Sequence, residues 1–220
     1  MLIAGVDEAG RGSVIGPLVI AGVSINENDL PNLIDLGVKD SKLLSPQKRE
    51  ELASQIKKLA LNYHFILLSP AEIDPVVESR RKLHKLNRLE AQAMARVIAV
   101  LKPDVVYVDA SDILADRFGD HIAENLLFSP KLICEHKADV KYPIVSAASI
   151  IAKVERDKVI SQLQKKHGNI GCGYPSDSKT VKFLEEWIEK FGSYPDFVRK
   201  SWKTSKRIKS KKDLRQKKLQ

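Results

Sequence analysis

The sequence contains few of the residues that crosslink small secreted proteins or build zinc sites. Cys134 and Cys172 are its only cysteines, and neither belongs to a CxxC motif or a Cys/His cluster. This usage argues against a disulfide framework and against structural zinc. We therefore expect both cysteines to be reduced thiols in a cytoplasmic protein.

Long apolar segments are also missing. No run approaches the ~18 residues of a membrane span, and MLIAGVDEAG has no basic region ahead of its apolar residues. We expect neither a membrane helix nor a cleaved signal. The 220 residues, 43% hydrophobic and 30% charged, suffice for one sizeable core with a small appendage.

Positive charge is concentrated at the C-terminus. The net charge of the chain is +9, and residues 199–220 hold eleven Lys or Arg against one Asp. The other 198 residues are close to neutral. A basic tail of this kind binds polyanions by counterion release, which predicts salt-sensitive nucleic-acid binding without sequence preference. A solvated, partly disordered end is the alternative.

Hydrophobic patterning predicts an α/β fold. A glycine turn joins the first two strands as antiparallel neighbours, and DVVYVD has the continuous apolar character of an internal parallel strand. Ser45 and Pro46 form a helix start. We expect strands at 2–6, 14–25, 63–68, 104–109 and 131–136, and helices at 46–61, 83–101, 145–167 and 178–192.

These elements predict a mixed five-stranded sheet flanked by helices, three strands in an antiparallel start and two parallel. The final helices would form a smaller lobe after the turn GNIGCGYPSD. We expect a catalytic domain over 1–168, a C-terminal helical lobe over 169–205 and a basic tail over 206–220.

Carboxylates follow two strands that this topology can place side by side. Asp7 and Glu8 end the first strand and Asp109 ends the fourth, while Asp139 lies just before the long helix, from where it could join them from a loop. Ligand sites in such sheets gather at strand ends. Divalent cations relieve the mutual repulsion of clustered carboxylates, and hard oxygen ligands suit Mg²⁺ or Mn²⁺.

Each acid also has a simpler interpretation. Asp7 and Glu8 could be polar residues at a strand end, Asp109 or Asp112 could cap a helix, and Asp139 could pair with Lys141 at the surface. The joint pattern favours the metal hypothesis. Taken alone, it predicts only a metal site in an α/β domain.

The glycine turn after the first acids fits neither common nucleotide motif. Gly10, Gly12 and Gly16 frame Arg11 with the spacing GxGxxxG, which is neither the GxGxxG of a dinucleotide fold nor the GxxxxGK[ST] of a P-loop. Glycines let the backbone approach a ligand and offer its N–H groups. We interpret the turn as a holder for a sugar-phosphate backbone, with cations beside it offsetting the carboxylates.

Five segments together resemble ribonuclease HII in its archaeal form. They are GVDEAGRGSVIGPLVIAGV, GVKDSKLLSPQKR, VVYVDA, HKADVKYPIVSAASIIAKVERD and GCGYPSD, and they span about residues 3 to 178 in the order of that family. The DEAGRG turn and the YPIVSAASIIAKVxRD segment are the most specific. Ser13 is a mild departure, where proline or cysteine is expected.

The resemblance implies a ribonuclease H-like fold with a C-terminal helical lobe. It implies an endonuclease that cuts the RNA strand of RNA–DNA hybrids and cuts at single ribonucleotides in duplex DNA, leaving 3′-hydroxyl and 5′-phosphate ends. Mn²⁺ or Mg²⁺ would be the cofactor. We expect a monomer with no membrane partner, and the sequence does not show whether a sliding clamp binds it.

The resemblance also assigns residues. By motif position the catalytic metal ligands are Asp7, Glu8, Asp109 and Asp139. Gly10, Arg11 and Gly12 would read the ribose 2′-hydroxyl and the RNA–DNA junction, and Tyr174 would pack on the sugar of the following deoxynucleotide. Ser41 and Lys42 match a phosphate-contacting position. The five histidines form no ligand-like pair, and we expect them to be structural or solvated, His136 being the one nearest an acid of the set.

Two other functions fit parts of the pattern. Four acids would also serve another nuclease on the same fold, such as a junction resolvase or a proofreading exonuclease, although the glycine turn and Tyr174 argue against it. The basic tail alone would fit a non-catalytic protein that binds RNA or DNA.

Overall fold

The computed structural model describes residues 1–38, 45–79 and 85–217. Its elements follow in the order β1 (Leu2–Ala9), β2 (Leu18–Asn26), the 3-10 helix η1 (Glu27–Asp29), α1 (Leu30–Asp35), α2 (Pro46–Leu59), β3 (Asn62–Leu68), α3 (Pro70–Glu78), α4 (Lys85–Leu101), β4 (Val105–Asp109), α5 (Ala115–Ala123), β5 (Lys131–Glu135), α6 (Ala138–Lys141), α7 (Pro143–His167), α8 (Ser178–Phe191) and α9 (Lys203–Lys217).

The chain divides into two compact units. The first contains Met1–Ala9, Val19–Leu67 and Leu83–Glu155, and the second contains Gly10–Leu18, Leu68–Lys82 and Arg156–Gln220. These units are defined by contacts. The sequence-based division into a catalytic domain over 1–168, a helical lobe over 169–205 and a basic tail over 206–220 stays a prediction.

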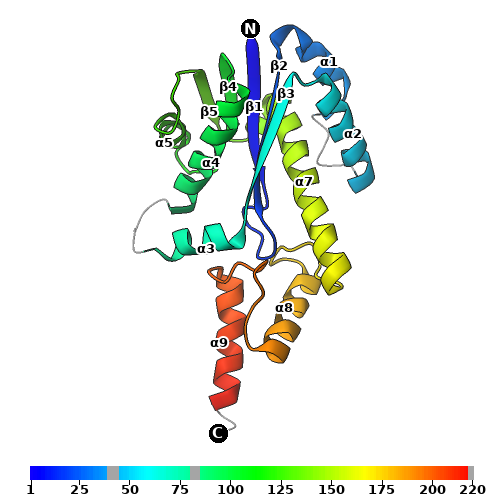
Figure 1. The fold of residues 1–220 in the computed structure, drawn as a ribbon, viewed down its shortest axis with the longest axis vertical. Helices are drawn as coiled ribbons and strands as arrows, with labels where there is room; N and C mark the ends of the chain where they lie inside the picture. Colours follow the sequence, from blue (N-terminus) through cyan, green and yellow to red (C-terminus); the bar gives the residue numbers. More distant parts are fainter. Residues whose placement is uncertain (39–44, 80–84, 218–220) are drawn as a thin grey trace. The chain divides into compact units, whose positions relative to one another are not determined.

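The first unit is built on the expected mixed sheet, whose five strands lie in the order β3-β2-β1-β4-β5 (Figure 1). β1 pairs antiparallel with β2, from Leu2 opposite Asn26 to Ala9 opposite Val19. On its other side β1 pairs parallel with β4, which in turn pairs parallel with β5. The prediction of a five-stranded α/β sheet is therefore confirmed.

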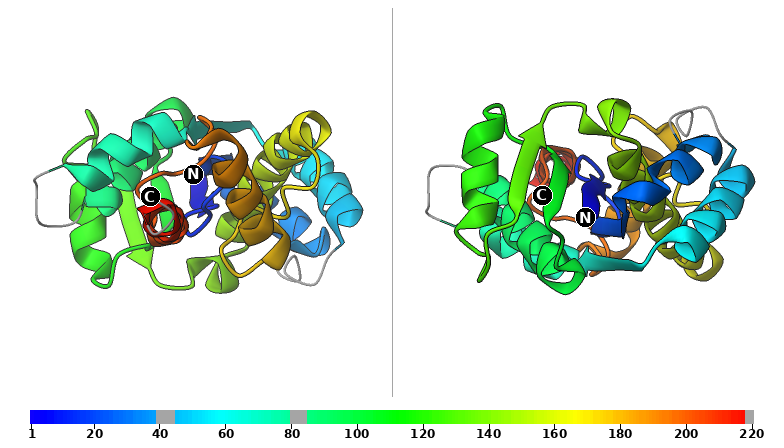
Figure 2. Two further views of the ribbon diagram at one scale, coloured as in Figure 1. Left: turned by 90° about the horizontal axis from the view of Figure 1, so that it is seen from below. Right: turned by 90° about the horizontal axis from the view of Figure 1, so that it is seen from above.

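Helices cover both faces of this sheet. α4 and α5 lie on one face, and α1, α2 and the first half of α7 lie on the other (Figure 2). Glycines in the two central strands permit close packing: a Cβ at Gly5 would lie 2.3 Å from the carbonyl oxygen of Ile144 in α7, and one at Gly22 would lie 2.6 Å from Val97 in α4. The alanines near the start of α7 belong to a buried hydrophobic cluster that also contains Ile3 of β1 and Val23 of β2.

β2 starts four residues later than predicted. Residues 14–17 do not pair with β1. Instead the N–H groups of Val14 and Ile15 both donate to the carbonyl of Gly173, at 2.8 and 3.1 Å. Ile15 also forms an isolated bridge with Val198. The apolar run 14–25 thus contributes its first part to the second unit and its remainder to the sheet.

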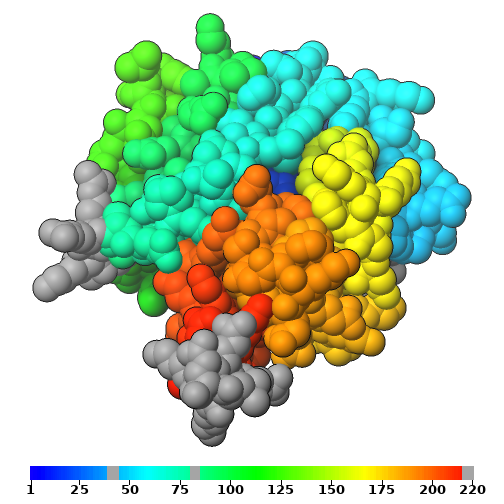
Figure 3. All heavy atoms as spheres, turned by 60° about the horizontal axis from the view of Figure 1, so that its bottom comes forward, coloured from blue at the N-terminus to red at the C-terminus, as the bar shows by residue number. Residues whose placement is uncertain are grey.

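The second unit has a core of its own. Its buried residues come from the 10–18 segment, the end of α7, α8, the first half of α9 and the loops before and after α8, and they include Ile15, Ile160, Leu184, Val198 and Ile208. Partly buried aromatic side chains surround that core, including Phe197 and Trp202. α8 and α9 lie side by side on the surface of this unit (Figure 3).

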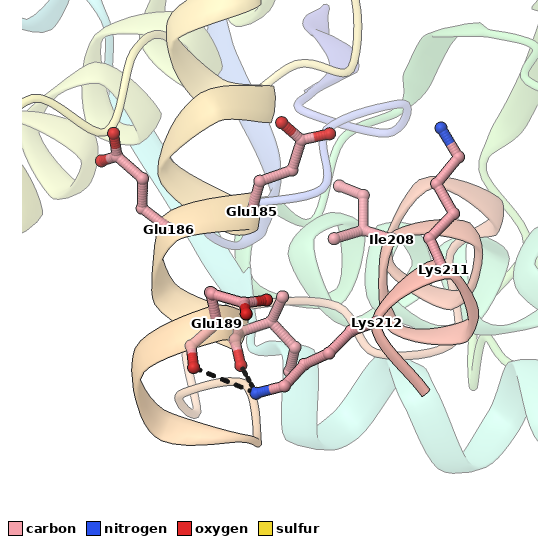
Figure 4. A pocket seen from close by; sticks show the side chains of 7 residues that line it. Glu185, Glu186, Glu189, Ile208, Lys211 and Lys212 are labelled. Atoms are coloured by element: carbon pink, nitrogen blue, oxygen red, sulfur yellow. Dashed lines mark hydrogen bonds between the residues drawn. The ribbon is translucent and has the colours of Figure 1, made fainter. Parts of the chain in front are cut away.

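The basic C-terminal segment forms a helix, α9, over Lys203–Lys217. Ser205, Ile208 and Lys212 share one face of α9 and are buried, whereas the neighbouring lysines and Arg207 are exposed. Lys212 reaches across to the last turn of α8, where its ammonium donates to the carbonyls of Ile188 and Glu189 (Figure 4). The last carbonyls of a helix lack internal partners and attract a cation. A partly disordered end is therefore wrong for residues 203–217.

A hollow of about 310 Å³ lies between α8 and α9 beside this lysine (Figure 4). It is lined by Ile188 and Ile208, by three glutamates of α8 and by Lys211 and Lys212 of α9.

Several helices agree with local signals in the sequence, and others were missed. Ser45 caps α2 by accepting from the N–H of Lys48, and Pro46 is its first residue, as predicted. α1, α3 and α6 were not predicted. α3 nevertheless starts with a full capping box, in which Ser69 and Glu72 bond to each other's backbone N–H. Among residues 1–38, 45–79 and 85–217, no helix has both the length and the apolarity to cross a membrane.

Gly5 gives a test of the packing between β1 and α7. We expect Gly5→Ala to lower the free energy of unfolding by about 3 kcal/mol, because the new methyl group would meet backbone atoms that cannot rotate away. Gly119→Ala in α5 is the matched control, since its Cβ would lie 3.4 Å from the Cβ of Cys134, an ordinary contact. The control should be neutral or gain up to about 1 kcal/mol from helix propensity. Equal denaturation midpoints for the two variants would contradict the packing described.

Candidate metal centre and glycine turn

Three carboxylates converge at the carboxyl end of β1 and β4. Because these strands are parallel neighbours, with Val6 opposite Val108, the residues that follow each of them leave the sheet at the same edge. Oxygen atoms of Asp7, Asp109 and Asp139 all lie within 4.8 Å of one another. The convergence expected from the sequence is present for these three acids.

Asp7 is the most deeply placed of the three, with 5% of its surface exposed. The pKa of its carboxyl is raised from 3.8 to about 7, mainly by burial and also by the charges of Asp109 and Asp139. Hydrogen bonds from the Ser149 hydroxyl and from the N–H of Glu8, at 2.7 Å, act in the opposite direction. The carboxylate form of Asp7 is thus held in a site that disfavours its charge.

Asp109 connects the strand to the element that carries Asp139. Its Oδ1 accepts from the backbone N–H of Ala138 at 3.1 Å, the first residue of α6. Asp139 therefore stands in the first turn of a short helix, and the prediction that it joins the others from a loop is wrong. Lys137, which precedes α6, has the left-handed φ of 57° that redirects the chain from β5 into this helix.

The far end of α6 is fastened by Glu135 at the end of β5. Its carboxylate accepts from the Tyr142 hydroxyl at 2.9 Å and from the Lys141 ammonium. The ring of Tyr142 also packs against Tyr107 of β4, with centroids 4.5 Å apart. Lys141 therefore pairs with Glu135, and the pairing of Asp139 with Lys141 that the sequence left open is not the one formed.

Glu8 leaves β1 on the opposite face from Asp7, because side chains alternate along a strand. It is half-buried, and its charge contributes to raising the pKa of the Cys134 thiol to about 12, although burial is the main cause. Glu8 is not one of the three converging carboxylates. Its role as a metal ligand stays a prediction.

The donor set fits a hard divalent cation. All three donors are carboxylates. Asp7 is buried, and its negative charge is disfavoured by burial and by the other two carboxylates. A bound divalent cation would relieve this repulsion. Among the described parts of the chain, no histidine belongs to this group of metal-ligand candidates.

His136 instead contacts the carbonyl of Ile113 through Nε2, at 3.1 Å. Asp112 pairs with Arg117, so it is a structural residue.

The glycine turn belongs to the second unit and is tightly packed. Gly10 has a φ of +86°, and a Cβ there would lie 2.6 Å from Nε of Arg156 and 2.8 Å from the carbonyl oxygen of Pro17. The carbonyl of Gly10 also accepts from the N–H and the hydroxyl of Ser13, at 3.2 and 2.8 Å. Ser13, where the family resemblance leads us to expect proline or cysteine, thus supplies a hydrogen bond that closes the turn. Gly12 is exposed.

Tyr174 lies next to this turn within the same unit. A Cβ on Gly12 would be 4.0 Å from Cε1 of its ring, and the Arg156 guanidinium lies 4.6 Å from the ring centroid. Arg156 also donates to the carbonyl of Cys172 at 2.8 Å. Gly10, Gly12 and Tyr174 are therefore brought together as the sequence-based assignment requires.

Sequence analysis missed two buried arginines and one serine at these sites. Arg156, Arg199 and Ser149 contact the residues described above. The motif HKADVKYPIVSAASIIAKVERD contains Ser149 and Arg156, whereas no motif contains Arg199. Ser41 and Lys42 lie outside the described residues.

Comparison with known proteins identifies one family. The sequence model of the ribonuclease HII family matches residues 4–205. Ribonuclease HII of Thermococcus sibiricus is 52% identical over 213 residues, covering 96% of this chain and 92% of that protein. Ribonuclease HII of Pyrococcus furiosus is 47% identical and covers 94% and 91%.

Solved structures agree with the sequence matches. Ribonuclease H2 of Pyrococcus horikoshii superposes with a TM-score of 0.88 at 45% identity, covering 96% of this chain and 98% of that one. The ribonuclease HII chain in a complex with PCNA from Archaeoglobus fulgidus gives 0.85 at 43%, with coverage of 94% and 96%. Bst-RNase HIII in complex with Mn²⁺ shares the fold, with a TM-score of 0.81 at 21% identity and coverage of 96% and 70%.

The raised pKa of Asp7 gives a test of the carboxylate cluster in the absence of metal. The folded state holds the Asp7 proton up to about pH 7, whereas the unfolded chain releases it near its usual pKa of 3.8. The cost of ionising Asp7 therefore grows as pH rises between these values and is complete above pH 7. In EDTA, Asp7→Asn should raise the free energy of unfolding by a few kcal/mol at pH 8 and by less at pH 5.

Asp120→Asn, an exposed aspartate of α5, is the control and should change stability little at either pH. Chemical denaturation of the three proteins at both pH values measures the difference. An Asp7→Asn variant less stable than the wild type at pH 8 would contradict the repulsion described here.

Proposed function

The chain belongs to the ribonuclease HII family, and we propose that the carboxylates at the edge of β1 and β4 hold the divalent ions that its reaction needs. It is a metal-dependent endoribonuclease that hydrolyses the RNA strand of RNA–DNA hybrids. The observation that carries the proposal is the convergence of Asp7, Asp109 and Asp139 within 4.8 Å.

The protein's own groups position and charge this site. Ser149 and the backbone N–H of Glu8 fix Asp7, while Asp109 fixes α6 and with it Asp139. When bound, divalent cations supply a nucleophilic water at neutral pH and stabilise the charge that develops on the leaving oxygen. We propose Mg²⁺ or Mn²⁺ as the ion and Glu8 as the fourth acid.

We further propose that Gly10, Arg11 and Gly12 read the 2′-hydroxyl of the target ribonucleotide. This hydroxyl is the group that separates RNA from DNA, and backbone groups of a glycine turn can bond it at close range. Tyr174 would pack on the deoxyribose that follows, where a bare C2′ lies flat against the ring. The proximity of Tyr174 to Gly12 supports this arrangement. Together they would permit cutting at a single ribonucleotide embedded in duplex DNA.

We propose that α9 contributes sequence-independent contacts to phosphates. Its exposed surface carries Lys203, Lys206, Arg207, Lys209 and Lys211, held toward solvent because the opposite face is buried. A sliding clamp is a candidate protein partner, since a relative from Archaeoglobus fulgidus was solved in complex with PCNA. A monomeric state and a cytoplasmic location also stay predictions.

The two competing functions are disfavoured on different grounds. A resolvase or proofreading exonuclease would need the carboxylates but not the packed glycine turn beside Tyr174. A non-catalytic binding protein would need the basic face of α9 but would gain nothing from a buried aspartate whose pKa is raised.

Cleavage of defined duplexes tests the proposed activity. With Mg²⁺ or Mn²⁺, the wild type should cut a DNA duplex bearing one ribonucleotide and an RNA–DNA hybrid, and leave the matched all-DNA duplex intact. Asp7→Asn should reduce turnover by at least about a thousandfold while substrate binding survives, because it removes a charge needed to hold the ions. Asp120→Asn should cut normally. Full activity of Asp7→Asn would contradict the metal role, and equal cutting of all three duplexes would indicate another nuclease.

The exposed lysines of α9 give a test that leaves the fold intact, whereas deleting residues 206–220 would remove the buried side chain of Ile208. We expect Lys209→Gln with Lys211→Gln to weaken duplex binding and to flatten the plot of log affinity against log salt by about 0.9 per lost phosphate contact. Turnover at saturating substrate should be unchanged. Lys58→Gln with Lys131→Gln removes the same charge from exposed positions of the first unit and should leave the slope as it is. A fall in saturated turnover would show that α9 takes part in catalysis.

A further inference from the structure

The most completely enclosed polar side chain of the second unit belongs to Arg199, which is 0% exposed. All three of its nitrogen atoms donate to backbone carbonyls of the glycine-rich segment. Nη2 donates to Gly10 at 2.8 Å, Nη1 to Arg11 at 2.9 Å and Nε to Gly16 at 3.2 Å. A single guanidinium therefore spans both ends of the turn, from a position about 190 residues away in the chain.

These bonds fix the direction of two successive peptide groups. In a trans peptide the C=O of one residue and the N–H of the next point in opposite directions, and the described chain contains no cis peptide bond. Because the carbonyls of Gly10 and Arg11 both point to Arg199, the N–H groups of Arg11 and Gly12 both point away from it. Gly12 itself is exposed. Successive N–H groups directed to one side form an anion- and oxygen-binding concavity.

Arg199 is itself held rigidly. Its backbone N–H donates to Val14 at 2.9 Å, and its carbonyl accepts from the Ser205 hydroxyl at 2.7 Å. Its guanidinium lies 4.8 Å from the centroid of the Trp202 ring. Lysine could not replace it, because an ammonium is a point donor without the planar fork that reaches three carbonyls and stacks on an indole. The burial of a charge in this position has a cost that ordinary packing would avoid.

We infer that Arg199 is a positioning residue for substrate recognition, which holds the N–H groups of Arg11 and Gly12 toward the ribonucleotide and thereby sets the preference for ribose. The inference rests on the proposed role of the turn in reading the 2′-hydroxyl. It adds that this role depends on a remote buried side chain, since glycine alone leaves the turn free to adopt other conformations. Arg199 makes no contact with the reacting atoms in this account.

The test compares binding of two DNA duplexes that differ only by one ribonucleotide, in EDTA so that nothing is cut. The wild type should bind the ribonucleotide-containing duplex more tightly. In Arg199→Lys the ratio of the two dissociation constants should fall at least fivefold toward 1. Its kcat/KM on the same duplex with Mn²⁺ should fall at least tenfold. Arg88→Lys, in an exposed ion pair with Glu124, is the matched control and should retain both values.

Mn²⁺ affinity, measured by calorimetry, should stay within about twofold of the wild type in Arg199→Lys, because the carboxylate centre keeps all its ligands. A merely structural role would lower the unfolding temperature and the active fraction but leave the ratio of dissociation constants intact, and that result would overturn the inference. If Arg199→Lys does not fold, Trp202→Leu decides. It removes the ring on which the guanidinium is stacked and so loosens its hold on the three carbonyls. The ratio should fall in this variant, and an unchanged ratio would also overturn the inference.

Gly12→Ala separates this inference from the proposed function on which it rests. Its Cβ has room, with the nearest atom 4.0 Å away, so the fold should survive while the methyl group obstructs the sugar. The role of the turn would be contradicted if the wild type bound both duplexes equally well. It would also be contradicted if Gly12→Ala kept the wild-type preference for the ribonucleotide-containing duplex. Loss of preference in Gly12→Ala with full preference in Arg199→Lys would contradict only the inference about Arg199.

Discussion

The parallel pairing of β1 with β4 is the constraint on which the candidate active site depends. It sets Asp7 and Asp109 at one edge of the sheet although a hundred residues separate them in the chain. Asp109 then accepts the N–H that starts α6, so the third acid is placed by the second. The same register requires Gly5, because α7 must approach β1 closely enough for Ser149 to reach Asp7. A local change in this strand pair would therefore move every carboxylate of the centre.

The centre is electrostatically unfavourable without a cation, and that property links its stability to its function. A buried aspartate beside two others has a raised pKa and lowers the stability of the empty site above neutral pH. Bound divalent ions would offset the negative charge of these carboxylates. The second unit follows a different principle, because there buried cations hold backbone oxygen atoms: Arg199 at the glycine turn and Lys212 at the end of α8. Acidic groups are arranged for the metal, and basic groups for the geometry of the backbone.

The sequence was sufficient for the sheet and for most of the candidate site. β-branched runs gave the strands, the first acids marked a strand end, and the family motifs located Gly10, Gly12 and Tyr174. It failed where a residue's partner lies far away in the chain. The segment 14–17 looked like a strand start but bonds to Gly173, and the basic C-terminus looked solvated although Ile208 and Lys212 are buried. Arg199 sits in a run of basic residues, where nothing local separates a buried arginine from its exposed neighbours. The capping box of α3, by contrast, was present in the sequence and was overlooked.

Anomalous diffraction at the manganese edge, from crystals of the wild-type protein soaked in Mn²⁺, tests the central claim most directly. We expect density between the carboxylates of Asp7, Asp109 and Asp139, at the roughly 2 Å separations typical of small divalent ions and oxygen ligands. Manganese bound elsewhere, with no ion between these three side chains at their present separation, would contradict a metal site at this edge of the sheet.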